Sequence, residues 1–187
     1  MTSPADLLAH LRAHTRDAHD RLEALGLARG LTTGELDASG YARVLRWQRR
    51  AHAAVEGGLA DFDWPGDYHY VPRANTLASE AIAPPAEPVR ALSRPDSLAA
   101  ATGRAYVLEG SSLGGNAILG HLRANPAVAA YAPFPFYAFQ REVGLVQWRR
   151  FVAFAKTRAW SVAEAEEAAT AAREVFGVFG RAAGQLV

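Results

Sequence analysis

The sequence predicts an all-α protein that folds as a single domain over residues 1–187. The chain has 187 residues, a length that favours one domain with a sizeable core. Half of the residues are apolar and 21% are charged, which is typical of a folded globular protein. Apolar residues recur with the spacing of helices, and no stretch shows the sustained alternation of a β-strand. We therefore expect a bundle of about six or seven helices.

Four segments carry residues typical of the start of a helix. Ser3–Asp6 places a proline at the first helical position. Thr32–Glu35 is expected to open a second helix that runs to about Glu56. Ser93–Asp96 precedes a glycine-rich segment, and Ser161–Glu164 is expected to open the last helix.

The remaining segments complete this outline. An aromatic-rich helix is expected between residues 136 and 157. Residues 61–70, 83–88 and 125–136 are rich in proline or glycine and are predicted to be connections. No internal repeat and no domain linker is visible, which supports one domain.

Charge and cysteine content exclude several classes of protein. The formal net charge is +1, which argues against a general nucleic-acid binder. The chain has no cysteine, so disulfides, thiolate metal sites and a cysteine nucleophile are excluded, and a reducing compartment fits. The first residues are too polar for a signal peptide, and no apolar run approaches the roughly 18 residues of a membrane span. We expect a cytoplasmic protein without a membrane or nucleic-acid partner.

Histidines are the first candidates for chemistry. His10 and His14 are four residues apart and share a helix face, so they could hold a metal ion. No third ligand is evident in the sequence, and we expect this pair to be surface residues. His19 lies on one helix face with Glu23, whose carboxylate could orient a metal-bound imidazole. An amphipathic helix with ion pairs on its exposed face explains the same pattern, and on this helix alone that interpretation is favoured.

The segment YVLEGSSLGGNAILGHL (106–122) has helical apolar spacing but contains several glycines. Each glycine costs a helix interior about 1 kcal/mol relative to alanine. Gly110 and Gly114 lie one turn apart on one face, and Gly115 widens that face. A turn fits poorly, because the apolar spacing continues on both sides. Tight helix–helix contact and close approach of a ligand to the backbone both remain possible explanations.

Two other classes of helical enzyme fit the sequence poorly. A di-iron carboxylate bundle needs Glu-x-x-His pairs, and no histidine here has an acidic residue three positions before it. A bundle of the thiamine-degrading type would need a nucleophilic cysteine or an acidic active-site cluster. The chain has no cysteine, and the sequence shows no such cluster.

Two long motifs together resemble the bacterial heme oxygenases. They are LRAHTRDAHDRLE (11–23) and AYVLEGSSLGGNAILGHL (105–122). The resemblance extends to YARVLRWQRRAHAAVE (41–56) and FYAFQREVGLVQWRRF (136–151), so it covers most of the chain in the same order. It implies the heme-oxygenase helical bundle, with heme held between a proximal helix and a kinked distal helix.

The resemblance also implies roles for residues on the proximal side and at the edge of the heme. His19 corresponds to the proximal iron ligand, and Glu23 corresponds to the carboxylate that supports it. Arg12 and Arg149 correspond to basic residues that meet the heme propionates. Position 153, where a further propionate-binding arginine can occur, is Ala153.

On the distal side, Gly110 and Gly114 correspond to the glycines at which the helix bends over the heme. Gly115 is expected to add to the same contact. A side chain at Gly110 or Gly114 would occupy the space in which dioxygen must lie across the porphyrin. Many members carry an aspartate after the first distal glycine. Ser111 stands there in this chain, and its hydroxyl can still hold a water molecule.

The reaction implied is the cleavage of heme by dioxygen and electrons to biliverdin, ferrous iron and carbon monoxide. Heme would be both cofactor and substrate, and an external reductase or ferredoxin-type donor would supply the electrons. We expect a monomer. The alternative is a protein that stores, senses or carries heme without turnover, which would need the same binding residues.

Overall fold

The computed structural model describes residues 6–80 and 88–184, and this part of the chain is helical without a β-strand, which confirms the all-α prediction. Seven helices have eight or more residues, and two have five. In chain order the α-helices are α1 (Leu7–Glu23), α2 (Gly26–Thr33), α3 (Ala38–Val55), α4 (Ala74–Ala78), α5 (Leu98–Gly110), α6 (Gly115–Ala124), α7 (Pro135–Phe139), α8 (Leu145–Lys156) and α9 (Val162–Gly184). The shorter segments are the 3-10 turns η1 (Ser111–Gly114) and η2 (Pro126–Tyr131) and the π turn η3 (Gln140–Gly144).

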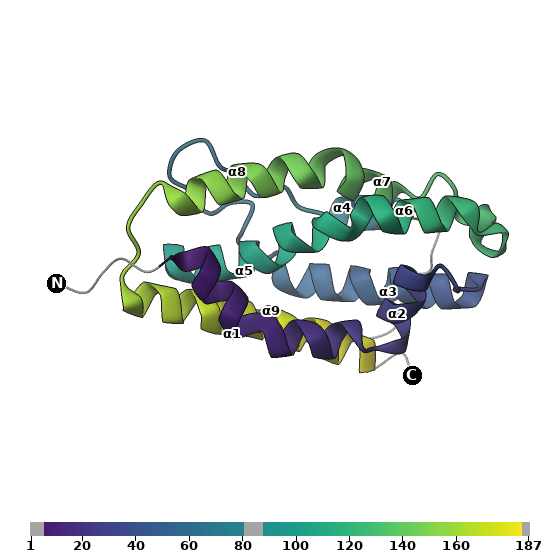
Figure 1. The fold of residues 1–187 in the computed structure, drawn as a ribbon, viewed down its shortest axis with the longest axis horizontal. Coiled ribbons are helices and arrows are strands. Elements are labelled where there is room, and N and C mark those ends of the chain that lie inside the picture. Colours follow the sequence, from purple (N-terminus) through teal and green to yellow (C-terminus); the bar gives the residue numbers. More distant parts are fainter. Residues whose placement is uncertain (1–5, 81–87, 185–187) are drawn as a thin grey trace.

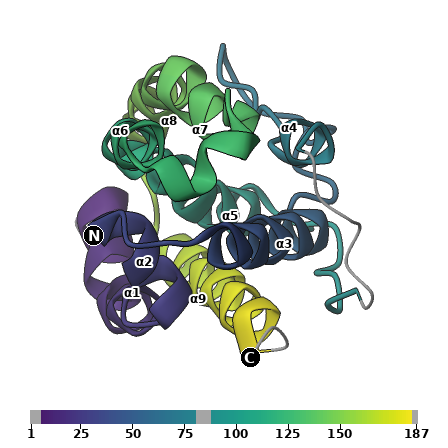
Figure 2. The ribbon, with the colours of Figure 1, turned by 90° about the vertical axis from the view of Figure 1, so that its right-hand side faces the viewer.

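Helix α5 lies at the centre of the bundle, with the other long helices around it (Figure 2). It packs most closely on α9, where a Cβ atom at Gly103 would lie only 1.9 Å from the carbonyl oxygen of Ala168. Glycine at this position therefore allows the two helix backbones to approach each other. Because nearly all of α5 is buried, its polar residues need partners inside the protein.

Helix α1 lies along α9 on one side of the molecule (Figure 1). Leu7 and Leu11 are its buried apolar anchors. Helix α3 packs on the C-terminal part of α9, and the Trp47 indole N–H donates a hydrogen bond to the Phe179 carbonyl oxygen at 2.8 Å. Helix α9 therefore joins both α1 and α3 to the central helix α5.

The predicted helix starts are confirmed in part. Asp6 caps α1, while the predicted proline start at residue 4 lies outside the described residues. The predicted start at Thr32–Glu35 is wrong, because α2 ends at Thr33 and Gly34 terminates it with a φ of 74°. The next helix begins at Ala38, where the Asp37 carboxylate accepts a hydrogen bond from the Gly40 N–H at 2.6 Å.

Ser97 caps α5, so this helix begins just after the predicted Ser93–Asp96. The predicted start at Ser161 is confirmed by a reciprocal capping box. The Ser161 N–H donates to the Glu164 carboxylate at 2.8 Å, and the Glu164 N–H donates to the Ser161 hydroxyl oxygen at 3.2 Å.

The predicted helix over residues 136–157 is confirmed, but the π turn η3 interrupts it between α7 and α8. Residues 61–70 form a connection without regular structure, as predicted. Residues 125–136 contain η2 and the start of α7, and most of 83–88 lies outside the described residues. Among the described helices, none is both long and apolar enough to span a membrane.

Candidate functional site

His19 lies near the C-terminal end of α1 with its ring 54% exposed. Its Nε2 is 3.6 Å from a Glu23 carboxylate oxygen, and its Nδ1 is 3.7 Å from an Asp20 carboxylate oxygen. The edge of the ring faces Phe176 of α9 at 6.1 Å between centroids. The sequence analysis missed Asp20. Because each ring nitrogen has a carboxylate nearby, a metal bound at one nitrogen leaves a carboxylate to orient the other.

The central helix approaches α1 one turn before His19. The Tyr106 hydroxyl interacts with the side chain of Thr15 and with the charge of Arg12. Burial raises the pKa of Tyr106, and these two neighbours partly offset the effect. Gly110 follows Tyr106 by one turn, as His19 follows Thr15, and the two helices run in the same direction (Figure 1). Tyr106 and Thr15 therefore form a contact between α5 and α1, and Gly110 and His19 each lie one turn beyond it on their own helix.

The glycine-rich segment breaks the distal helix into α5, the 3-10 turn η1 and α6. A short 3-10 stretch between two α-helices changes the direction of the backbone, and it often marks a functional hinge. Ser111 is exposed, and its hydroxyl donates a hydrogen bond to the Leu108 carbonyl oxygen at 2.7 Å. The hydroxyl oxygen remains able to accept a hydrogen bond from water.

The glycines in this region divide into two groups. A Cβ atom at Gly115 would lie 2.7 Å from the Gln140 Cβ, and one at Gly144 would lie 2.3 Å from the Ser112 Cβ. These two glycines allow the π turn to pack against η1 and the start of α6, so the structure gives Gly115 a packing role.

The second group consists of Gly110 and Gly114. A Cβ atom on either would meet nothing nearer than 3.7 Å, which is ordinary contact, and both have negative φ angles open to any residue. Neither packing nor backbone conformation therefore requires glycine at these two positions.

A buried polar network that the sequence analysis missed lies beside this segment. The Glu109 carboxylate is fully buried and pairs with the Arg73 guanidinium at 2.6 Å. The Tyr68 hydroxyl donates to Glu109 at 2.9 Å, and Arg73 donates to the Ser112 hydroxyl oxygen at 3.0 Å. Ser112 in turn donates to the Gln140 side chain. This network ties the residues on either side of Gly110 to the loop before α4 and to η3.

A second buried carboxylate, Glu56, holds the start of α4. It accepts hydrogen bonds from His52 at 2.8 Å, from the Tyr70 hydroxyl at 2.7 Å and from the Arg73 N–H at 2.9 Å. Burial acts to raise the pKa of Glu56, but these donors and the charge of His52 outweigh it and lower the pKa to about 2. Glu56 therefore stays ionised and keeps Arg73 in position.

Arg12 of α1 and Arg149 of α8 are both exposed. Among the described residues, no carboxylate lies within 4.0 Å of either guanidinium. Both are therefore available to the carboxylate groups of a ligand.

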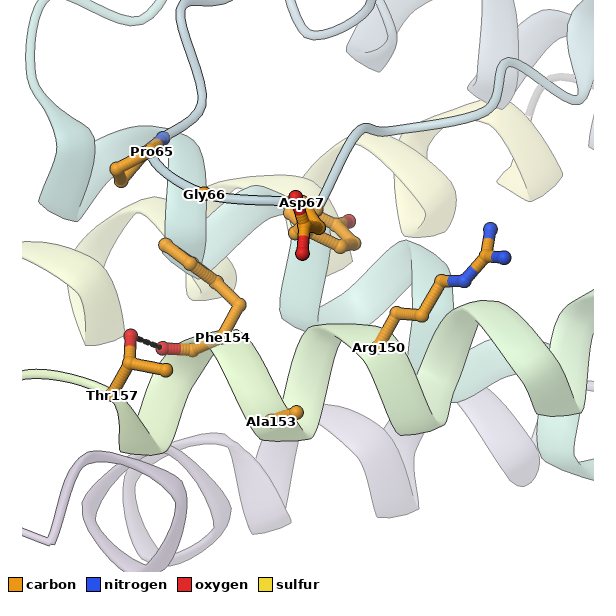
Figure 3. Close-up of a pocket in the computed structure, with 8 residues that line it drawn as sticks. Pro65, Gly66, Asp67, Arg150, Ala153, Phe154 and Thr157 are labelled. Carbon is orange, nitrogen blue, oxygen red and sulfur yellow. Dashed lines mark hydrogen bonds between the residues drawn. The ribbon is translucent and has the colours of Figure 1, made fainter.

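Two surface hollows lie elsewhere. One of about 700 Å³ lies between residues 65–68 and α8, where Ala153 and Phe154 line it (Figure 3). A second, of about 750 Å³, lies between residues 90–93, Arg104 and α9. Neither is lined by His19 or by Gly110, so neither corresponds to the predicted site.

Comparison with known proteins shows the family to which the chain belongs. No family model matches the chain. A curated protein of Xanthomonas campestris pv. campestris named heme oxygenase is 33% identical over 160 residues, which cover 82% of this chain and 94% of that protein. The crystal structure of heme oxygenase-1 from Synechocystis sp. PCC6803 in complex with heme matches with a TM-score of 0.68 at 15% identity, covering 97% of this chain and 92% of that one. This identity over nearly the whole relative shows that the chain belongs to the heme oxygenase family.

Proposed function

We propose that this protein binds heme between α1 and the segment from Gly110 to Gly114 and cleaves it to biliverdin, ferrous iron and carbon monoxide. One observation supports this site above the others. Gly110 and Gly114 weaken a helix without serving any contact or backbone angle of the protein itself. Gly120 and Gly180 also have open Cβ positions, but Gly110 and Gly114 lie at the two ends of the turn η1, where a ligand would need the space.

His19 is the residue that would hold the heme iron. Its ring is exposed at the surface of α1 rather than buried in the core, and a carboxylate lies near each nitrogen. A neutral imidazole ligand suits this chemistry, whereas a thiolate would favour O–O cleavage. Either Glu23 or Asp20 would fix the tautomer and raise the basicity of the ring.

When bound, heme supplies both the redox-active iron and the macrocycle that is cleaved. The chain supplies position and space. Arg12 and Arg149 would pair with the propionates and so fix the rotation of heme in the site. Gly110 and Gly114 would leave room beside the porphyrin for dioxygen, and the Ser111 hydroxyl would hold water next to it.

Further features of the proposal concern partners. The chain has no cysteine to bind an iron–sulfur cluster, so an external reductase or ferredoxin-type donor would deliver the electrons. A monomer and a cytoplasmic location stay predictions from the sequence.

The test is a titration of the purified protein with hemin, followed by a reductant in air and recorded by absorbance. We expect a one-to-one complex whose Soret band decays into a biliverdin spectrum. His19→Ala should lose the ligand-dependent spectrum and most turnover, while His69→Ala, at an exposed loop position, should retain both. A complex that never decays would support storage or sensing without turnover. No complex, or an unchanged spectrum in His19→Ala, would contradict the assignment of His19.

A further inference from the structure

A second cluster of metal-ligating side chains lies where α1 meets the start of α9. His10 and His14 come from α1, and Glu166 comes from α9. The Nε2 atoms of His10 and His14 lie 3.2 Å and 3.7 Å from one Glu166 carboxylate oxygen. The fold thus supplies a third ligand for the histidine pair, which the sequence alone did not reveal.

The two imidazole rings stack on each other beside Glu166, so one ring must rotate before both Nε2 atoms can face one ion. They stack with 3.9 Å between centroids and 25° between planes. The Nδ1 of His14 lies 2.9 Å from the His10 carbonyl oxygen. A proton on Nδ1 would be donated to that oxygen, which leaves the Nε2 lone pair free.

The environment of His10 also points to a missing partner. Its Nε2 is buried and makes no hydrogen bond within the described part of the chain, although Glu166 lies beside it. A buried polar atom without a hydrogen bond is uncommon, and an ion that is not part of the chain is one explanation.

We propose that His10, His14 and Glu166 bind a divalent transition-metal ion, with zinc as the first candidate. Two imidazoles and one carboxylate are a known zinc donor set, and water can complete the coordination. Ligand atoms about 2.1 Å from a tetrahedral ion lie roughly 3.4 Å apart. The observed nitrogen–oxygen distances of 3.2 Å and 3.7 Å bracket that value, and rotation of one imidazole out of the stack would complete the site.

This site is separate from the proposed heme site and does not depend on it. His10 precedes His19 by nine residues, which is roughly 13 Å along a helix. A bound ion would link α1 to α9, and α9 also supplies Phe176 beside the His19 ring. The metal would therefore hold the helix that carries His19 against its neighbour.

The test is calorimetric titration of the full-length, heme-free and tag-free chain with zinc chloride, with cobalt(II) absorption as an independent readout. We expect one ion per chain. Loss of a group that only hydrogen-bonds a metal ligand weakens metal binding roughly 10- to 100-fold. His14→Ala and Glu166→Gln remove ligands themselves, so each should weaken zinc binding by at least that factor. The His14 side chain is 40% exposed and that of Glu166 is 51% exposed, so both variants should fold, which circular dichroism checks.

Two control variants make the result specific. His69→Ala removes an exposed histidine from a loop and should bind zinc as the parent does. His19→Ala should also bind zinc normally. Loss of binding in His19→Ala alone would assign the ion to the cluster of His19, Asp20 and Glu23 and overturn the proposal. Weak binding without defined stoichiometry, or equal binding in all variants, would overturn it as well.

The outcome is also distinguishable from that of the heme experiment. A chain that binds one zinc ion but no heme would refute the proposed function and support this site. A chain that degrades heme but binds no zinc would do the reverse.

Discussion

Replacing Gly110 with alanine should make the heme-free protein more stable. The new Cβ atom would lie 3.7 Å from the Trp148 ring, and the backbone angles of −62° and −34° are those of a helix. Alanine therefore adds helix propensity of about 1 kcal/mol without a clash. In a domain of this size, such a gain corresponds to a rise in melting temperature of roughly 2–4 °C. Heme turnover by the same variant should fall, because the methyl group enters the space left for the ligand.

The matched control is Gly103→Ala in the same helix. Its Cβ atom would lie 1.9 Å from the Ala168 carbonyl oxygen, so the helices must separate, and overpacking of this kind costs about 1–3 kcal/mol or more. Urea unfolding followed by circular dichroism measures both changes. If Gly110→Ala destabilises the protein as Gly103→Ala does, or keeps full turnover, Gly110 serves helix packing and the argument for the distal site is refuted.

Two further predictions concern the buried carboxylates. Arg73→Met leaves Glu109 buried without its cation, which should cost about 3–5 kcal/mol of unfolding free energy, and adding Glu109→Gln should recover part of this loss. Additive losses in that double-mutant cycle, measured by urea unfolding, would refute the coupling. Because the pKa of Glu56 is lowered from 4.5 to about 2, its contribution of about 3 kcal/mol is present above pH 4.5 and is lost as the pH falls toward 2. In Glu56→Gln, the free energy of unfolding should therefore fall less steeply between pH 4.5 and pH 2 than in the parent. An equal fall in both proteins would contradict the assignment.

The sequence predicted most of the fold because its signals are local. The Ser161 capping box and the 61–70 connection depend on residues close together in the chain, and both are confirmed. The prediction for Thr32–Glu35 is wrong because threonine followed by glycine is compatible with either end of a helix. Only the structure shows that Gly34 terminates α2 in a left-handed conformation.

Prediction of the candidate site was limited by contacts between distant segments. Helical spacing placed His19 and Gly110 on the correct kinds of element, and the resemblance assigned their roles. Periodicity does not show which helices face each other, so it could not predict that Glu166 lies beside His10 or that Arg73 pairs with Glu109. It also could not distinguish Gly110, whose Cβ position is open, from Gly115, which packs on Gln140.

The π turn Gln140–Gly144 also sets the orientation of α8. A π turn contains one residue more than the α-helical turn it replaces, so the helix after it is rotated by roughly 100° relative to an uninterrupted α-helix. With this extra residue, α8 buries Phe151 in the core and exposes Arg149. Deleting one residue from the turn would restore α-helical register and rotate α8 as a whole, so that Phe151 and Arg149 would both face other parts of the bundle. The sequence of α8 sets the angle between Phe151 and Arg149, and the backbone insertion before the helix sets which surface of the bundle receives this guanidinium.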